Sequence, residues 1–480
     1  MNKKRELARN TLIILVGKIC TQFISFFLLP LYTSVLISSE FGLVDLVTTY
    51  IGLIVPVITL QLESSLFRYL VDVRSNEREK KIILSKVVIS ATIQTIICIL
   101  VFFVISNFIY INYKYYIFGI VIATIFSNLL LQTARGLGDN VGYSIGSVIA
   151  GSLTIIFNLI FLVLLKIGPK GMFLSMAMAN LLSSIYLGIR IKINRFINYE
   201  YLDKKIIEKL LKYSMPLIPN GIIWWIINVS DRTIISIFLG NSANGIYAIS
   251  NKFSGVFITI YNIFNTSWTE SASLHIDADD RDEFFSSTIS LMFKLFSCMC
   301  LGIIAYMPLI FRIMINEQYS DSYNYIPILM LSSLFNVIVG LISVVYVAKK
   351  LTKEIAKTSF WSGVINIGSN LIMIKFIGIY AASLSTLLSF MVMALYRYID
   401  VQKYVKIRFS KKLIIQTIII FLITIFIYYK NNIILNVFGM IVVTVYSVVI
   451  NKEFILHALE VIKGKLKRYL DNRETIKVLK

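Results

Sequence analysis

The segment PLIPNGIIWWIINVSDRTIISIFLG occupies residues 216–240 and decides the fold class. It is long and apolar enough to cross a bilayer as a helix, which takes about 20 residues. Yet it opens with Pro216 and Pro219 and carries Asp231 and Arg232 near its far end. A charge at the bilayer centre costs roughly 2.5–3.5 kcal/mol on insertion scales. We therefore expect this helix to line a polar space inside a membrane protein.

Similar apolar runs recur along the whole chain. Its 480 residues are 57% hydrophobic and only 15% charged. A single soluble core cannot bury that much apolar surface, and we count about fourteen runs of membrane-spanning length. The first run, from Thr11, is too long for a signal peptide and is predicted to span the membrane. Residues 44–72 are predicted as one further span. The predicted fold is therefore an all-α polytopic membrane protein of about 14 transmembrane helices.

Basic residues gather in the connections on one face of the predicted bundle. The chain has 47 Lys and Arg against 26 Asp and Glu, which gives a formal net charge of +21. Positive charge is retained in the cytoplasm during insertion, so both termini are predicted to be cytoplasmic. The surplus charge then indicates topology and attraction to anionic membrane lipids, and it does not indicate nucleic acid as a partner.

An internal sequence repeat predicts two related halves of the chain. LYTSVLISSEFGLVDL, from Leu31, is matched by IISIFLGNSANGIYAI, from Ile234, so that Gly42 corresponds to Gly245 at an offset of 203 residues. An even number of helices lies between the copies, so they share one orientation, as in a parallel repeat. The predicted domains are an N-terminal six-helix lobe (1–193), a cytoplasmic linker (194–211), a C-terminal six-helix lobe (212–403), two additional transmembrane helices (404–452) and a basic cytoplasmic tail (453–480).

The polar residues of these helices lie at helical spacing. Asn220, Asn228 and Asp231 fall on one face of the opening segment. Four repeat-related helices carry such faces, which favours one shared water-filled cavity. Hydrogen bonding between packed helices is the alternative for any single Asn or Ser. Asp231, Arg232 and Lys252 are expected at similar depth, where they either neutralise one another or contact a ligand.

No residue pattern supports catalysis or metal binding. The four cysteines lie inside apolar runs, where they are small apolar filler. The two histidines, His275 and His457, lie in polar sequence. Asp277-Ala278-Asp279 has the spacing of a sugar-nucleotide motif, but acids at a helix start are ordinary capping residues. We expect no catalytic residue, no metal site and no cofactor, and we predict that the protein is not an enzyme.

Residues 212–253, KYSMPLIPNGIIWWIINVSDRTIISIFLGNSANGIYAISNKF, resemble the Wzx-type polysaccharide flippase family. This family lies within the multidrug/oligosaccharidyl-lipid/polysaccharide exporter superfamily. The resemblance implies two six-helix lobes around a central cavity that opens alternately to either side of the bacterial cytoplasmic (inner) membrane. It also implies an undecaprenyl-pyrophosphate-linked oligosaccharide as cargo, for capsule, exopolysaccharide or O-antigen biosynthesis. Polysaccharide assembly proteins are then candidate partners.

Such a cargo needs cations and hydrogen-bonding groups. Arg suits bidentate contact with phosphate, and Lys acts as a point charge. Arg68 and Arg135 have the alternative of reaching lipid headgroups. Glu63 and Asp231 are the buried acids expected to bind a coupling proton or sodium ion. The candidate substrate-binding residues are Lys18, Arg68, Arg135, Asn228, Arg232, Lys252 and Lys294.

Two other functions remain open at this point. A multidrug or metabolite exporter of the same fold would favour an acidic and aromatic cavity, whereas cations outnumber acids here. A membrane-embedded polysaccharide polymerase or ligase is the alternative from another class. It would need a sizeable outer loop with catalytic residues, and the predicted outer loops are short.

Overall fold

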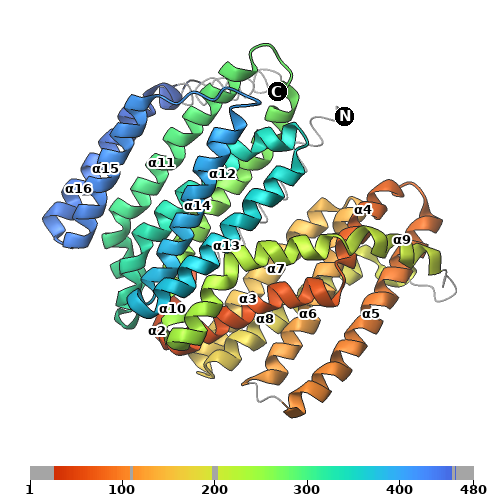
Figure 1. Ribbon diagram of the computed structural model, residues 1–480. Helices are drawn as coiled ribbons and strands as arrows, with labels where there is room; N and C mark the ends of the chain where they lie inside the picture. Colours follow the sequence, from red (N-terminus) through yellow and green to blue (C-terminus); the bar gives the residue numbers. More distant parts are fainter. Residues whose placement is uncertain (1–25, 109–111, 197–203, 457–459, 461–480) are drawn as a thin grey trace, which may run out of the picture. The chain divides into compact units, whose positions relative to one another are not determined.

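The computed structural model describes residues 26–108, 112–196, 204–456 and 460, and within these ranges the chain forms helices and no strands (Figure 1). The elements in chain order are α2 (Leu29–Val35), α3 (Ser38–Ile58), α4 (Leu62–Asp72), α5 (Glu77–Phe108), α6 (Lys114–Leu137), α7 (Asn140–Asn158), the π-helical η1 (Leu159–Leu164), α8 (Pro169–Ile191), the 3-10 helix η2 (Ile193–Arg195), α9 (Lys204–Ser214), α10 (Leu217–His275), α11 (Arg281–Met314), the 3-10 helix η3 (Glu317–Tyr325), α12 (Ile326–Ala348), α13 (Thr352–Ile377), α14 (Tyr380–Val401), α15 (Lys411–Lys430) and α16 (Ile433–Ile450).

The predicted fold class is confirmed. Eleven of the described helices are long and apolar enough to cross a membrane. α10 is a further case, because its 59 residues are interrupted at Gly240, whose φ of 86° and ψ of 173° are not helical. The two spans predicted on either side of that glycine fall within α10 and stay predictions. The count of fourteen stays a prediction, since most of the first span, from Thr11, lies outside the described residues.

The prediction of a single span over residues 44–72 is wrong. α3 ends at Ile58 and α4 begins at Leu62. Between them Leu60 and Gln61 take left-handed φ values of 51° and 52°. Pro56 lies in the last turn of α3, where it removes one amide donor and crowds the preceding turn. The helix therefore stops and turns inside the segment that was predicted as one span.

The described chain divides into two compact units. Unit 1 comprises residues 1–259, 314–325 and 359–389, and unit 2 comprises 260–313, 326–358 and 390–480. α10, α13 and α14 each contribute residues to both. The predicted lobe borders at 193 and 212, and the borders of the C-terminal segments, stay predictions.

Small residues bring the helices of unit 1 close together. Gly146 of α7 lies against Leu187 of α8, where an added Cβ would come within 2.9 Å of the leucine side chain. Ser183 of α8 donates a hydrogen bond of 2.8 Å to the carbonyl of Gly146. Close backbone approach at small residues is the usual basis of helix packing inside membranes, where apolar side chains gain little by leaving lipid.

An ion pair and the amphipathic helix α9 stabilise one end of unit 1. Asp139 accepts from the amide of Gly142 at the start of α7 and meets the Arg190 guanidinium through contacts of 2.6 and 3.0 Å. This hydrogen bond to Arg190 lowers the pKa of Asp139 below its ordinary value. Nearby, Leu210 of α9 is buried in an apolar cluster with residues of α4, α5 and α6. α9 (Lys204–Ser214) thus overlaps the C-terminal end of the predicted linker.

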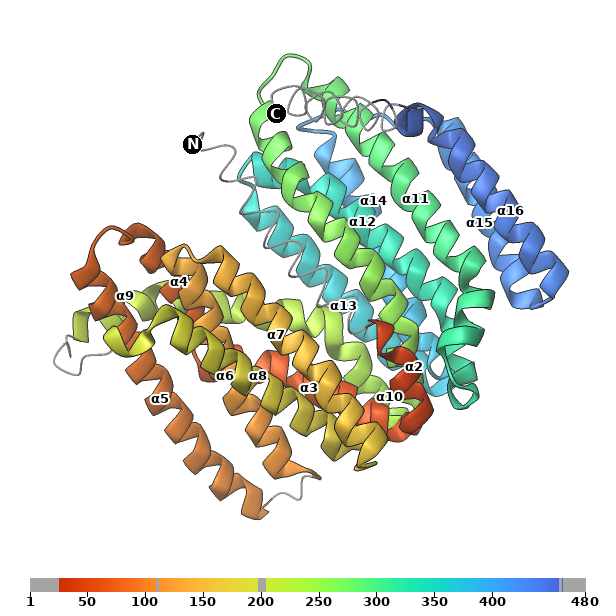
Figure 2. The same ribbon diagram turned by 180° about the vertical axis from the view of Figure 1, so that it is seen from behind.

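Unit 2 contains the C-terminal helices. α15 and α16 lie side by side in both views (Figures 1 and 2). They are joined at Asn431, which has a left-handed φ of 46°, and Asn432, whose side chain caps α16. The hydroxyls of Tyr306 in α11 and Thr444 in α16 are 3.0 Å apart. Single polar bridges of this kind join helices whose remaining surface is apolar.

Candidate functional site

A cluster of three charges lies within unit 1. The Nε atom of Arg232 is 2.7 Å from Oδ2 of Asp45, and Nζ of Lys252 is 3.9 Å from Oδ1 of the same carboxylate. Asp45 belongs to α3, and both cations belong to α10. The Asp45 side chain is only 7% exposed, whereas that of Lys252 is 37% exposed. One carboxylate thus faces two cations.

Asp45 was missed by the sequence analysis. We considered Asp231 and Lys252 as the neutralising neighbours of Arg232, but the carboxylate that Arg232 binds is 187 residues away along the chain. The signal was present in the sequence, because an acid inside a membrane-spanning segment demands a partner or a wet cavity. Asp45 stands in the apolar run FGLVDLVTTY and satisfies that condition.

Asp231 faces a different set of partners. It is 4% exposed. Its Oδ2 accepts hydrogen bonds from the hydroxyls of Tyr247 at 2.9 Å and Thr386 at 2.6 Å, and its Oδ1 accepts from Nδ2 of Asn370 at 3.1 Å. Successive residues of a helix point about 100° apart, so Asp231 and Arg232 turn toward different neighbouring helices.

Further polar side chains lie around the Asp231 carboxylate. Asn366 donates from Nδ2 to the Thr386 hydroxyl at 3.1 Å, and Ser230 donates to Oδ1 of Asn366 at 3.2 Å. The carbonyl oxygen of the Asn370 side chain is buried and has no hydrogen-bond partner among the described residues. An unsatisfied acceptor beside a carboxylate is a place where a proton or a small cation would be stabilised.

Glu63 lies at the corner between α3 and α4. It stands in the first turn of α4, where the helix dipole favours a negative charge. Its Oε2 is buried without a hydrogen-bond partner in the described part of the chain. The adjacent Gln61 donates from Nε2 to the carbonyl of Leu217, 3.1 Å away at the start of α10. The second predicted acid is therefore placed beside a link between two helices of unit 1.

Arg68 and Arg135 lie on α4 and α6, which pack together. Arg68 is 2.5 Å from Asp72, one turn along α4, and both side chains are about half exposed. The Arg135 guanidinium lies 4.3 Å from the ring centre of Phe67, which is a cation–π contact. Neither contact was predicted. Both leave guanidinium donors available to a phosphate or to lipid headgroups.

The other predicted residues are placed less fully. Lys294 belongs to α11 in unit 2, is half-buried and forms no ion pair with any described residue. Lys18 and the side chain of Asn228 lie outside the described residues.

The turns of the internal repeat meet in unit 1. A Cβ added to Gly42 would lie 1.9 Å from the carbonyl oxygen of Asn241, and one added to Gly245 would lie 2.0 Å from that of Ser38. Asn241 and Gly245 follow Ser38 and Gly42 by 203 residues each, so the contact is reciprocal. The hydroxyls of Ser38 and Ser242 are 2.5 Å apart. The two copies therefore close against each other at the turns, around a local two-fold relation.

The comparisons with known proteins agree with this architecture. Residues 7–269 match the model of a family described as "Polysaccharide biosynthesis protein". No curated protein sequence matches the chain.

Three solved structures illustrate the fold. The lipid II flippase MurJ, in an inward closed conformation, is 16% identical with a TM-score of 0.68, over 93% of this chain and 100% of that one. An inward-facing multidrug resistance MATE family transporter of the MOP superfamily is 12% identical with a TM-score of 0.68, over 80% and 95%. A MOP superfamily transporter from Pyrococcus furiosus is 12% identical with a TM-score of 0.56, over 82% and 95%. The chain is thus a multi-pass membrane protein with the fold of these transporters.

Proposed function

Because the chain belongs to the family of polysaccharide biosynthesis proteins, we propose that it is a flippase for lipid-linked oligosaccharides. Its cargo is an undecaprenyl-pyrophosphate-linked repeat unit, which moves from the inner to the outer leaflet of the bacterial cytoplasmic membrane. The repeat unit then serves the assembly of capsule, exopolysaccharide or O-antigen. The fold shared with a lipid II flippase supports this cargo class.

The observation that carries the proposal is that two cations, Arg232 and Lys252, share the single carboxylate of Asp45. Arg232 lies 2.7 Å from one oxygen of the buried Asp45 carboxylate. Lys252 is left partly exposed, 3.9 Å away. A pyrophosphate, like a carboxylate, offers pairs of oxygens that accept two hydrogen bonds from one guanidinium. It can therefore bind Lys252 and compete with Asp45 for the guanidinium of Arg232. The site therefore suits an anionic group that binds and leaves.

Alternating access requires one side of the cavity to close while the other opens. The reciprocal contact of Gly42 with Gly245 is a closure of this kind, because backbone meets backbone without an intervening side chain. Opening this side must separate the two turns and break the bond between Asn244 Nδ2 and the Gly42 carbonyl, which measures 2.8 Å. Both changes are local, so modest binding energy can drive them.

A coupling ion is proposed at Asp231, with Glu63 as the second candidate. A proton on Asp231 would supply the donor that the side-chain oxygen of Asn370 lacks. A sodium ion would instead find oxygen ligands on Asp231, Asn370 and Thr386, as hard cations prefer. Either ion would bias transport only through different affinities for the two conformations. No other cofactor is proposed.

The membrane topology is part of the proposal. Both termini are placed in the cytoplasm because the basic connections fall on their side. Membrane lipids and polysaccharide assembly proteins are the proposed partners, and nucleic acid is not. The family and fold are those of transporters, so we propose no enzymatic step.

A multidrug or metabolite exporter is the second candidate function. The likeness to multidrug transporters of the MATE family favours it. The two functions differ in the expected charge of the cargo, because the partly exposed ammonium of Lys252 would repel a cationic drug.

The test is transport by the purified protein in proteoliposomes. Undecaprenyl-pyrophosphate-linked oligosaccharide is placed in the membrane, and a membrane-impermeant periodate reagent reports how much sugar has crossed. We expect time-dependent flipping that Lys252→Ala slows markedly. Lys430→Ala, which removes the same charge from the end of α15, is the control and should leave the rate unchanged. Export of a cationic dye without flipping of the oligosaccharide would refute the proposal in favour of the exporter.

A further inference from the structure

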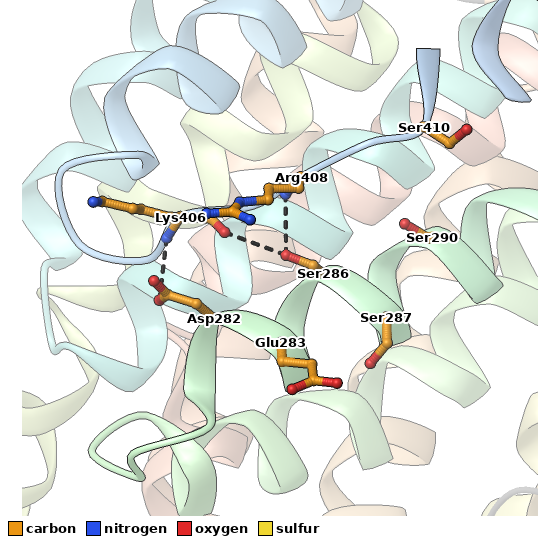
Figure 3. Close-up of a pocket in the computed structure, with 8 residues that line it drawn as sticks. All are labelled: Asp282, Glu283, Ser286, Ser287, Ser290, Lys406, Arg408 and Ser410. Atoms are coloured by element: carbon orange, nitrogen blue, oxygen red, sulfur yellow. Dashed lines mark hydrogen bonds between the residues drawn. The ribbon is translucent and has the colours of Figure 1, made fainter. Parts of the chain in front are cut away.

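A polar pocket of about 560 Å³ lies within unit 2, apart from the residues assigned above. It is formed by the first turns of α11 and by residues 402–410, the strap that joins α14 to α15 (Figure 3). Its lining residues are Asp282, Glu283, Ser286, Ser287, Ser290, Lys406, Arg408 and Ser410.

The strap is held in one conformation. Val405 and Ile407 are 1% and 2% exposed, whereas Lys406 and Arg408 between and beyond them are exposed. Ser286 accepts from the amide of Arg408 at 3.0 Å and donates to the carbonyl of Lys406 at 3.2 Å. Apolar anchors thus alternate with outward cations, as in an extended segment. A strap whose backbone is already held loses less loop freedom when an anion binds to it.

The pocket offers more donors than its own acceptors use. The ammonium of Lys406 and the guanidinium of Arg408 form no ion pair with any described residue. The hydroxyl of Ser290 has no hydrogen bond within the described chain. Ser410 accepts from the amide of Leu413, so its own proton remains available. Such a set of donors fits a ligand made of acceptors, and a phosphate is one.

Two acids line the same pocket without cancelling these cations. The Asp282 carboxylate accepts from the backbone amide of Lys406 at 3.2 Å and lies 3.4 Å from Nε of Arg281. Glu283 points away from the strap in Figure 3. In the preceding loop, Asp277 is paired with Lys349 at 2.8 Å.

The location indicates what brings the phosphate. The strap connects α14, which ends at Val401, to α15, which begins at Lys411, and both helices are of membrane-spanning length. Tyr398 packs on Phe409 of the strap with ring centres 5.6 Å apart. Tyrosine is enriched at the level of the lipid headgroups. We therefore infer that this pocket binds the anionic phosphodiester headgroup of a membrane phospholipid, with the Arg408 guanidinium as its main donor and Lys406 adding positive charge at its edge.

The inference can be tested on the purified full-length protein by native mass spectrometry. The probes are phosphatidylglycerol and phosphatidylcholine of equal chain length. We expect the wild type to bind phosphatidylglycerol more tightly. The double variant Lys406→Gln, Arg408→Gln should weaken it by roughly tenfold or more, since each surface cation contributes about fivefold. Arg408→Lys, which keeps the charge and loses the fork, should have an intermediate affinity and guards against a folding defect.

The matched control is Lys411→Gln, Lys412→Gln, which removes the same charge just beyond the pocket. It should change the affinity far less than the pocket double variant. Equal losses in the two double variants would overturn the inference, because they would mean general attraction by the basic surface. Equal binding of phosphatidylcholine, or displacement of the lipid by millimolar inorganic phosphate, would also overturn it. The test needs no transport and is independent of the proposed cargo.

Discussion

Replacing Gly42 with alanine should force open the contact between the repeat-related turns. The new Cβ would lie 1.9 Å from the carbonyl oxygen of Asn241 and 2.6 Å from the amide nitrogen of Gly245. Real Cβ atoms essentially never come closer than 3.0 Å to such atoms, so the turns must separate by at least 1.1 Å. Both obstacles are backbone atoms, and no side-chain rotation can relieve them.

The energetic effect follows from this displacement. Overpacking of a tightly fitted contact costs about 1–3 kcal/mol. If only the closed arrangement suffers that cost, the equilibrium shifts about 5–150-fold toward arrangements with separated turns. Gly245→Ala should have a similar effect, because its Cβ would meet the Ser38 carbonyl at 2.0 Å. The double variant should shift the equilibrium less than the sum of the two, since one separation relieves both clashes.

Cysteine labelling measures this shift. Asn244 is fully buried beside Gly42, so a cysteine at this position should react slowly with a membrane-impermeant maleimide. The four native cysteines are replaced by serine beforehand. Adding Gly42→Ala should accelerate the labelling. Gly52→Ala is the control on the same helix, because its Cβ would meet nothing within 4 Å. Equal labelling rates for the Gly42 and Gly52 variants, or strictly additive effects of the two alanines, would refute the reasoning.

Three further predictions concern single carboxylates. Asp45→Asn should lower the stability of the purified protein by about 3–5 kcal/mol, because it leaves two cations near a buried site without their acid; a midpoint of thermal unfolding equal to that of the wild type would contradict this. Asp231→Asn should remove any dependence of oligosaccharide flipping on the sodium or proton gradient while leaving slow downhill flipping; an unchanged ion dependence would exclude Asp231 as the coupling acid. The Asp139–Arg190 pair lowers the pKa of Asp139, so its contribution to stability is present above the ordinary carboxyl pKa of 3.8 and is lost as pH falls through the lowered value. In unfolding scans of the detergent-solubilised protein, Arg190→Gln should therefore cost stability at pH 6 and progressively less as the pH falls below 3.8; an equal cost at every pH would show that the ion pair is not responsible.

The membrane fold could be predicted from the sequence because its signal is averaged over long segments. A spanning helix needs about 20 apolar residues, so a few polar positions do not erase it. The corner at Gln61 illustrates the limit. Pro56 stands inside the predicted span, but whether a proline bends a helix or ends it depends on neighbouring elements, here including the Leu217 carbonyl.

The site was only partly accessible to sequence reasoning. The helical spacing of residues in α10 identified Asp231 and Arg232 as special, and both prove to be engaged in polar contacts. Their partners could not be identified, because Asp45, Asn370 and Thr386 lie 187, 139 and 155 residues from them. A single sequence contains no record of such long-range pairing, and the two helix faces differ by about 100° at adjacent residues.

The adjacency of Asp231 and Arg232 makes their order along the chain as important as their presence. Asp231 accepts hydrogen bonds from Tyr247 and Thr386, and Arg232 donates to Asp45. Any rotation of this part of α10 about its axis would therefore displace both side chains from their partners at the same time. Exchanging the two residues would preserve composition, net charge and hydropathy. It would nevertheless place a guanidinium against the hydrogen-bond donors around position 231 and a carboxylate against Asp45. Donors would then face donors, and the two carboxylates would repel each other.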